Sequence, residues 1–208
     1  MVIKKLCFYA ICFILAGCAR NLEPTAMPSN TPTKPASGQS IETTPSKDAN
    51  AIHAWEIRGL FAARNAKKAW SAQIDWQQNG PKYYQIRFFG PMGGGATLIT
   101  CSGGKVTYQD EHKKISANSA SSLMKQQTGV SLPVESLYYW ARGLPAPSAP
   151  VSSSSYGPQK QLLQLKQSGY TLNYSDYKVF HGYRLPNKIL LEGQGVRLKL
   201  VIKSWSID

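Results

Sequence analysis

Apolar and polar residues alternate along the chain from Trp55 onward, which is the pattern of β-strands with one buried face. The clearest segments are 55–63 and 70–77, and the second leads into Asn79-Gly80, a dipeptide that favours a tight hairpin turn. The same alternation predicts further strands at 82–89, 96–101, 106–109, 113–116, 161–166, 170–174, 183–191 and 196–206. Together these segments predict an antiparallel meander of about ten strands.

Two short helices are predicted where the alternation stops. Helix formers follow a cap candidate at Asn118 or Ser119 and predict a helix over 118–128, and Pro133 favours the start of a second helix over 134–142. The stretch 145–158 is rich in serine and proline and is expected to be a loop. The pattern therefore predicts a mainly β fold, in which one antiparallel sheet is strongly curved and both helices lie across its open side.

The apolar face of this sheet, together with apolar positions on the helices, is the candidate binding interior. Its members are Trp55, Ile57, Phe61, Trp70, Ile74, Trp76, Tyr84, Ile86, Phe88, Leu123, Leu137, Trp140, Leu198, Leu200 and Ile202. Most such residues simply fill a core. A sheet closed by two small helices can instead leave a cavity large enough for a lipid, and the residues alone leave both interpretations open.

The first eighteen residues have the layout of a secretory signal. Lys4 and Lys5 precede an apolar run over 6–15, which is too short to span a bilayer and ends in small residues before Cys18. Leu-Ala-Gly-Cys at 15–18 resembles the lipobox of bacterial lipoproteins, which implies removal of a signal peptide over 1–17 and acylation of Cys18. An ordinary signal peptide with a chance cysteine is the alternative.

A flexible tether is expected over 18–50, ahead of one folded domain over 51–208. The tether contains five prolines among Thr, Ser, Asn and Lys and lacks aromatic residues, so it cannot bury enough apolar surface to fold. As a flexible coil it would have an r.m.s. span of roughly 30 Å. Because Ala19 rather than an aspartate follows Cys18, the resemblance to lipoproteins implies the periplasmic face of the outer membrane.

The charge of the chain suggests what it meets in the envelope. Removal of Lys4 and Lys5 with the signal lowers the formal net charge from +13 to +11. A basic surface at a membrane can meet anionic lipid headgroups or an acidic protein, and no nucleic acid is expected at this location. In the folded part Cys101 is the one cysteine, so no intramolecular disulfide is expected.

Chemical motifs are lacking, and neither an enzyme nor a cofactor is expected. His53, His112 and His181 fall on different predicted elements, without metal-site spacing. The glycine-rich stretch 90–95 lacks the Lys-Ser/Thr of a phosphate-binding P-loop.

Three stretches resemble the LolB family of outer-membrane lipoproteins. They are Leu-Pro-Val at 132–134 with Leu-Tyr-Tyr-Trp-Ala-Arg-Gly-Leu-Pro at 137–145, Arg-Phe-Phe-Gly-Pro-Met-Gly at 87–93, and Leu-Pro at 185–186 with 198–205. The resemblance implies an incomplete antiparallel β-barrel with a helical lid over an apolar cavity. It implies a monomer that accepts acylated lipoproteins from the periplasmic carrier LolA and inserts them into outer-membrane phospholipid. A lipoprotein of similar fold that binds a free lipid, or a structural one that binds another protein, is the alternative.

The loop Gly90, Pro91, Met92 and Gly93 is the candidate membrane-insertion element. Its single large apolar side chain has no local cover, because proline fixes the approach and glycines follow. Met92 could equally fill a gap in the core, as flexible methionines often do. The resemblance implies that an exposed apolar residue at this place inserts substrate into the membrane.

Overall fold

The computed structural model of this chain describes residues 47–90, 95–128 and 133–208. Cys18, the signal peptide, most of the tether and the loop residues Pro91, Met92 and Gly93 therefore lie outside the described residues. The strands are β1 (Ala54–Arg64), β2 (Ala69–Asn79), β3 (Tyr83–Phe89), β4 (Ala96–Ser102), β5 (Lys105–Gln109), β6 (Lys114–Ala117), β7 (Val151–Tyr156), β8 (Leu162–Gln167), β9 (Tyr170–Phe180), β10 (Tyr183–Gly193) and β11 (Val196–Ile207). The helices are η1 (Ala49–Ala51), α1 (Ala120–Thr128) and α2 (Val134–Trp140).

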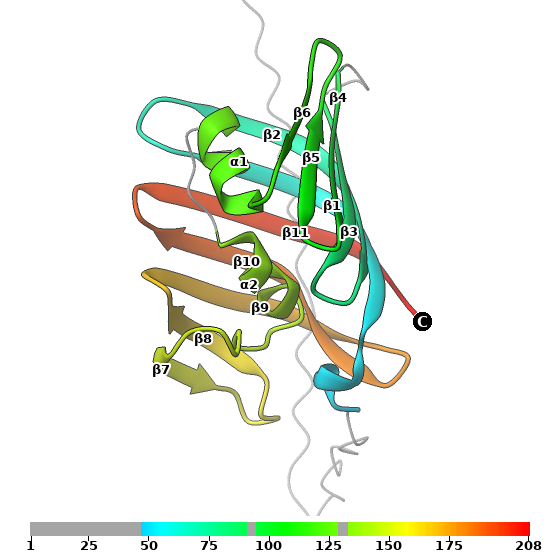
Figure 1. Cartoon of the computed structure of the whole chain (residues 1–208). Coiled ribbons are helices and arrows are strands. Elements are labelled where there is room, and N and C mark those ends of the chain that lie inside the picture. The colour runs from blue at the N-terminus through cyan, green and yellow to red at the C-terminus, as the bar shows by residue number, and fades with distance from the viewer. Residues whose placement is uncertain (1–46, 91–94, 129–132) are drawn as a thin grey trace, which may run out of the picture. The chain divides into compact units, whose positions relative to one another are not determined.

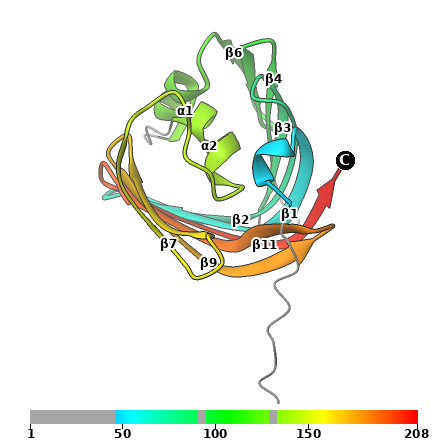
Figure 2. The same ribbon diagram turned by 90° about the horizontal axis from the view of Figure 1, so that it is seen from below.

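All the strands join one antiparallel sheet in the order β6-β5-β4-β3-β2-β1-β11-β10-β9-β8-β7. The first strand pairs with the last, so each half of the chain forms a continuous meander on one side of that pair. Seen along its axis, the sheet curves around α1 and α2 and leaves a gap between the edges β6 and β7 (Figure 2). The fold is the incomplete barrel with helices across its open side that the sequence predicts.

The strand register gives the curved sheet two distinct ends (Figure 1). The turns β1–β2 and β10–β11 lie at one end, since Arg64 pairs with both Ala69 and Arg197. The β8–β9 turn lies there too, since Thr171 pairs with Glu192 at the end of β10. Gly90 follows β3 at this same end, which we call the loop end. The opposite end carries the β9–β10 turn and Lys47, whose backbone N–H donates to the Gly182 carbonyl at 2.7 Å. We call it the tether end.

A bulge in the central strand pair brings two backbones into close contact. The register between β1 and β11 shifts at Arg58/Gly59, and a Cβ atom at Gly59 would lie 2.1 Å from the Val201 carbonyl oxygen. Only glycine fits this approach, and bulges of this kind increase the local bend of a strand. The glycine thereby contributes to the curvature that turns the sheet around the helices.

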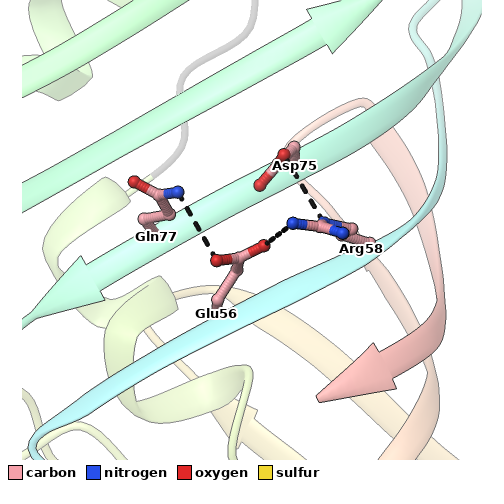
Figure 3. Close-up of polar contacts among 4 residues, drawn as sticks. All are labelled: Glu56, Arg58, Asp75 and Gln77. Carbon is pink, nitrogen blue, oxygen red and sulfur yellow. Dashed lines mark hydrogen bonds and ion pairs between the residues drawn. The ribbon is translucent and has the colours of Figure 1, made fainter. Parts of the chain in front are cut away.

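The outer face of β1 and β2 carries the polar members of the alternating pattern. Arg58 contacts Glu56 at 2.6 Å and Asp75 at 3.7 Å, and the Gln77 amide donates to Glu56 at 3.4 Å (Figure 3). Ion pairs this exposed contribute at most about 1 kcal/mol each. They mark the convex side as the solvated side, so the apolar face is the concave one.

Both helices start and end near the predicted positions. Ser119 Oγ accepts the Ser122 N–H at 3.2 Å at the start of α1, which is the cap interaction expected for this position. Helix α2 is followed by Gly143 with φ +74°, and a Cβ atom there would lie 2.8 Å from the Tyr177 hydroxyl. Gly143 thus allows both the left-handed turn that ends α2 and the close packing of that turn on β9.

Two expectations from the sequence are wrong. The serine-rich part of 145–158, expected to be a loop, contains β7, an edge strand paired with β8 whose residues are all exposed. The tether was expected to reach residue 50, but residues 47–50 belong to the folded part. Lys47 bridges to Tyr183, and the Asp48 carboxylate caps η1 by accepting the Asn50 N–H at 2.9 Å.

Candidate functional site

The fifteen residues predicted to line an apolar interior lie together on the concave face. Eleven are buried members of one core cluster, and Trp70, Tyr84, Phe88 and Leu137 are half-buried and pack against it. The helices cover this face (Figure 2), with Leu123 of α1 at 2% exposure and Trp140 of α2 at 1%. The structure therefore brings the predicted residues together under the lid. Their contact with an acyl chain stays a prediction.

Aromatic side chains gather at both ends of the concave face. At the tether end, the Trp55 ring lies 4.8 Å from Trp76 and 5.5 Å from Trp205 between centroids. At the loop end, Phe61 lies 4.8 Å from Trp70 and 5.3 Å from Phe88. We call Phe61, Trp70 and Phe88 the loop-end cluster. Because Trp70 and Phe88 keep part of their surface exposed, this cluster is apolar surface of the concave face that solvent reaches at the loop end.

Several polar atoms under the lid lack a hydrogen-bond partner in the part of the chain that the structure describes. The indole N–H groups of Trp55 and Trp205 and the Tyr84 hydroxyl are buried without a hydrogen bond to any residue that the structure describes. Burial raises the pKa of the Tyr84 hydroxyl, with a smaller contribution from Cys101. A buried donor left unpaired costs about 1–3 kcal/mol. The closed interior therefore carries an energetic cost that water or a polar part of a ligand would relieve.

Helix α2 is anchored at its C-terminal end by Gln167 of β8. The side-chain oxygen Oε1 of Gln167 accepts from the Trp140 indole N–H at 2.7 Å and from the Ala146 backbone N–H at 2.9 Å. Its amide nitrogen donates to the carbonyls of Ala146 and Ala149, both at 2.7 Å. All four bonding positions of this buried side chain are used, which fixes the segment after α2 to the sheet.

Arg142 anchors the same region on its other side. Its Nε donates to the Tyr138 carbonyl at 3.1 Å, and its Nη1 donates to the carbonyls of Ala49 and Ile52. The guanidinium lies 4.0 Å from the centre of the Tyr138 ring, a cation–π contact. Burial lowers the pKa of Arg142, and the nearby Tyr138, Tyr139 and Asp48 act in the opposite direction.

Among the residues whose side chains the structure describes, helix α1 has fewer polar contacts than α2. Its buried contacts are apolar, chiefly Ala120 and Leu123. The Ser121 hydroxyl links it to α2 by donating to the Glu135 carboxylate and accepting from the Val134 N–H, both at 3.4 Å, near the upper limit for a hydrogen bond. The short length of both helices suggests few anchoring side chains, yet Gln167 and Arg142 hold the α2 region by several hydrogen bonds.

The base of the candidate insertion loop lies beside an apolar hollow. Gly90 is half-buried and borders a recess of about 400 Å³ on the outer face, which Leu60, Val201 and Lys199 also line. Leu60 is 43% exposed. Apolar surface therefore lies on both sides of the sheet at the loop end.

The residues that the structure describes form neither a candidate metal centre nor a membrane-spanning helix. Within 47–90, 95–128 and 133–208, no group of three or more His, Cys, Asp or Glu residues could hold a metal ion. In the same ranges, no helix is long and apolar enough to cross a membrane.

An open β-barrel with helices closed over an apolar concave face is the architecture of proteins that hold an apolar ligand between sheet and lid. Similar in fold is the crystal structure of a LolA superfamily protein from Nitrosomonas europaea, with a TM-score of 0.52 at 9% identity, over 76% of this chain and 87% of that one. The chain belongs to the LolB family: the family model described as outer membrane lipoprotein LolB matches residues 53–205.

Relatives named outer-membrane lipoprotein LolB agree with this assignment. The chain is 38% identical to that of Cellvibrio japonicus over 162 residues, which are 76% of this chain and 79% of the relative. It is 34% identical to that of Nitrosococcus oceani over 195 residues, covering 93% and 92%. The chain is accordingly a lipid-anchored protein of the outer membrane.

Proposed function

We propose that this chain accepts acylated lipoproteins from the periplasmic carrier LolA and inserts them into the outer membrane by binding and releasing their acyl chains. The observation that supports this most is the concave apolar face covered by two short helices, of which α2 has more polar contacts than α1 among the described residues. An acyl chain needs such a shielded route, because each methylene costs about 0.8 kcal/mol in water and one long chain costs on the order of 10 kcal/mol.

The transfer needs no ATP and no catalytic step. If the concave face holds acyl chains more tightly than the carrier and less tightly than the bilayer, transfer follows from the differences in affinity. The loop-end cluster is the proposed point of entry, because Trp70 and Phe88 keep part of their surface exposed there. The remaining concave residues would line the space that opens when the lid moves.

Helix α1 is the proposed moving part of the lid, and α2 its fixed part. This can be tested with Ser121→Cys and Glu135→Cys joined by a short bismaleimide, in a Cys18→Ala, Cys101→Ala background. The two side chains are in contact, so the link locks α1 onto the anchored helix. Acyl-chain binding should be lost on cross-linking, and the same protein before cross-linking is the control. Equal binding by the locked form would contradict gating by α1.

Cys18 is the proposed lipidation site, and Gly90, Pro91, Met92 and Gly93 form the proposed insertion loop. Burying one methionine in the bilayer is worth only about 1.5–3 kcal/mol. This is too little to anchor the domain but enough to bias the loop end toward outer-membrane phospholipid during release. A monomer suffices for this mechanism.

Depletion of this protein in its own cells tests the function as a whole. Other lipoproteins should then accumulate in the periplasm bound to LolA, and re-expression should clear them. Normal delivery of lipoproteins after depletion would favour a protein that binds free lipid or another envelope protein.

A further inference from the structure

A groove of about 770 Å³ lies at the tether end, away from the loop-end cluster. It is formed by the first described residues, by the segment after α2 and by the connection between β7 and β8. Its lining includes the cations Lys47, Arg142, Lys160 and Arg184 and one acidic residue, Asp48. The excess of positive charge in a concave space favours an anionic ligand.

Arg142 supplies a buried charge to this groove. It is 3% exposed, and its three hydrogen bonds all go to backbone carbonyls. These bonds involve Nε and Nη1 and use three of the five guanidinium N–H groups. Among the described residues, no carboxylate lies within 4.0 Å of Arg142. A buried charge without a close counter-ion is costly, and a bound anion would offset that cost.

Lys160 adds a cation that is exposed and held in a defined turn. Its backbone N–H donates to the Gly157 carbonyl at 2.9 Å, and its φ of +60° places it at a tight bend between β7 and β8. Beyond the cations, Leu144, Pro145 and Leu162 give the groove an apolar part. A water molecule takes about 30 Å³, so the groove has room for an organic group attached to a phosphate.

We propose that this groove binds the phosphate group of a phosphate ester, with Arg142 and Lys160 facing the phosphate and the alcohol part lying against Leu144 and Pro145. Guanidinium and ammonium groups together suit phosphate oxygens, because Arg142 keeps the two N–H groups of Nη2 beyond its three carbonyl bonds and the ammonium group is a point charge. The ester can come from two sources, a phospholipid headgroup or a soluble metabolite. Lys47 lines the groove and is the point at which the segment from the proposed lipid anchor joins the domain. A phospholipid headgroup is therefore a ligand that the anchored protein can meet.

The first experiment tests the phosphate chemistry with glycerol 3-phosphate as the probe. It is titrated into the mature chain carrying Cys18→Ala, and the Arg142 Nε–H signal is followed in ¹H–¹⁵N spectra. A saturable shift is expected. Lys160→Glu should weaken binding by about tenfold or more, since a nearby charge is reversed. Lys114→Glu, the same change at an exposed lysine on β6, should leave binding within about twofold. An unsaturable shift, or equal weakening by both variants, would overturn the proposal.

The second experiment separates the two sources. Vesicles of phosphatidylglycerol and phosphatidylethanolamine are sedimented with the same three proteins. A lipid headgroup is the ligand if the parent and Lys114→Glu proteins sediment, Lys160→Glu does not, and glycerol 3-phosphate competes. A soluble ester is the ligand if that compound binds while sedimentation is the same for both variants. If the parent protein shows neither the saturable shift with glycerol 3-phosphate nor sedimentation with vesicles, the site is rejected. That result would leave the proposed acceptance of lipoproteins at the loop end untouched, because it concerns the opposite end of the domain.

Discussion

Replacing Gln167 by alanine should strongly destabilise the anchored half of the lid. The substitution removes four hydrogen bonds of 2.7–2.9 Å that join β8 to Trp140, Ala146 and Ala149. It also leaves the buried Trp140 indole and the Ala146 backbone without these partners. Among the described residues, the polar contacts left to the α2 region would be chiefly those of Arg142 and the Tyr138 hydroxyl bond to the Ile52 carbonyl.

The magnitude follows from those four bonds. Each contributes about 0.5–1.5 kcal/mol net, and the groups left behind cost more if water does not reach them. We therefore expect Gln167→Ala to lower the free energy of unfolding by about 3–5 kcal/mol, well above the average of about 1 kcal/mol for a point mutation. Gln164→Ala is the matched control: it lies on the same strand but loses one side-chain bond of 2.9 Å to Asn173. It should cost about 1 kcal/mol or less.

Urea unfolding followed by tryptophan fluorescence measures both variants. Native-state hydrogen exchange should in addition show faster exchange at Ala146 in Gln167→Ala, because the segment after α2 opens locally. A loss below about 1 kcal/mol, or a loss equal to that of Gln164→Ala, would refute the reading of Gln167 as the anchor of α2.

Three further predictions concern the sheet, the loop and the tether. Gly59→Ala should lower the free energy of unfolding by at least about 2 kcal/mol, because its Cβ would overlap the Val201 carbonyl; an unchanged melting temperature would contradict this. Met92→Glu should leave folding and substrate acceptance intact and slow delivery to liposomes; if it instead unfolds at a lower temperature with normal delivery per folded molecule, Met92 is a core residue. Shortening 19–46 to eight residues, a reach of about 27 Å, should impair delivery by the anchored protein, because the eleven residues of β1 alone span about 36 Å between the tether end and the loop end. Equal delivery by both tether lengths would show that the loop end need not turn toward the membrane that holds the anchor.

The strands and the concave face could be predicted from the sequence because period-two alternation depends on local chemistry. Trp55, Ile57 and Phe61 follow one another on the buried side of β1 as the pattern requires. Strand β7 could not be predicted this way, since its serines are exposed on both faces and it lies at the sheet edge, paired with β8 alone among the described strands. An edge strand without a buried face carries no alternation to detect.

The anchors of α2 also escaped prediction. Arg142 belongs to a recognisable motif, but its carbonyl partners at Ala49 and Ile52 lie some ninety residues earlier in the chain. Gln167 ends a strand in which glutamine reads as a polar outward position, yet it is 1% exposed. Their roles depend on which loops the sheet brings together, and short-range patterns do not encode that. The contact of Arg142 with Ala49 likewise explains why the folded part begins earlier than the composition suggests.

Direct transfer in a purified system tests the central claim. A labelled lipoprotein bound to LolA is mixed with the mature chain carrying Cys18→Ala, without ATP or membranes, and the complexes are separated. The label should move from LolA to this chain, and should then pass to added liposomes. If the label stays with LolA while the chain is folded and its lid is free to move, the chain is not the acceptor of acylated lipoproteins.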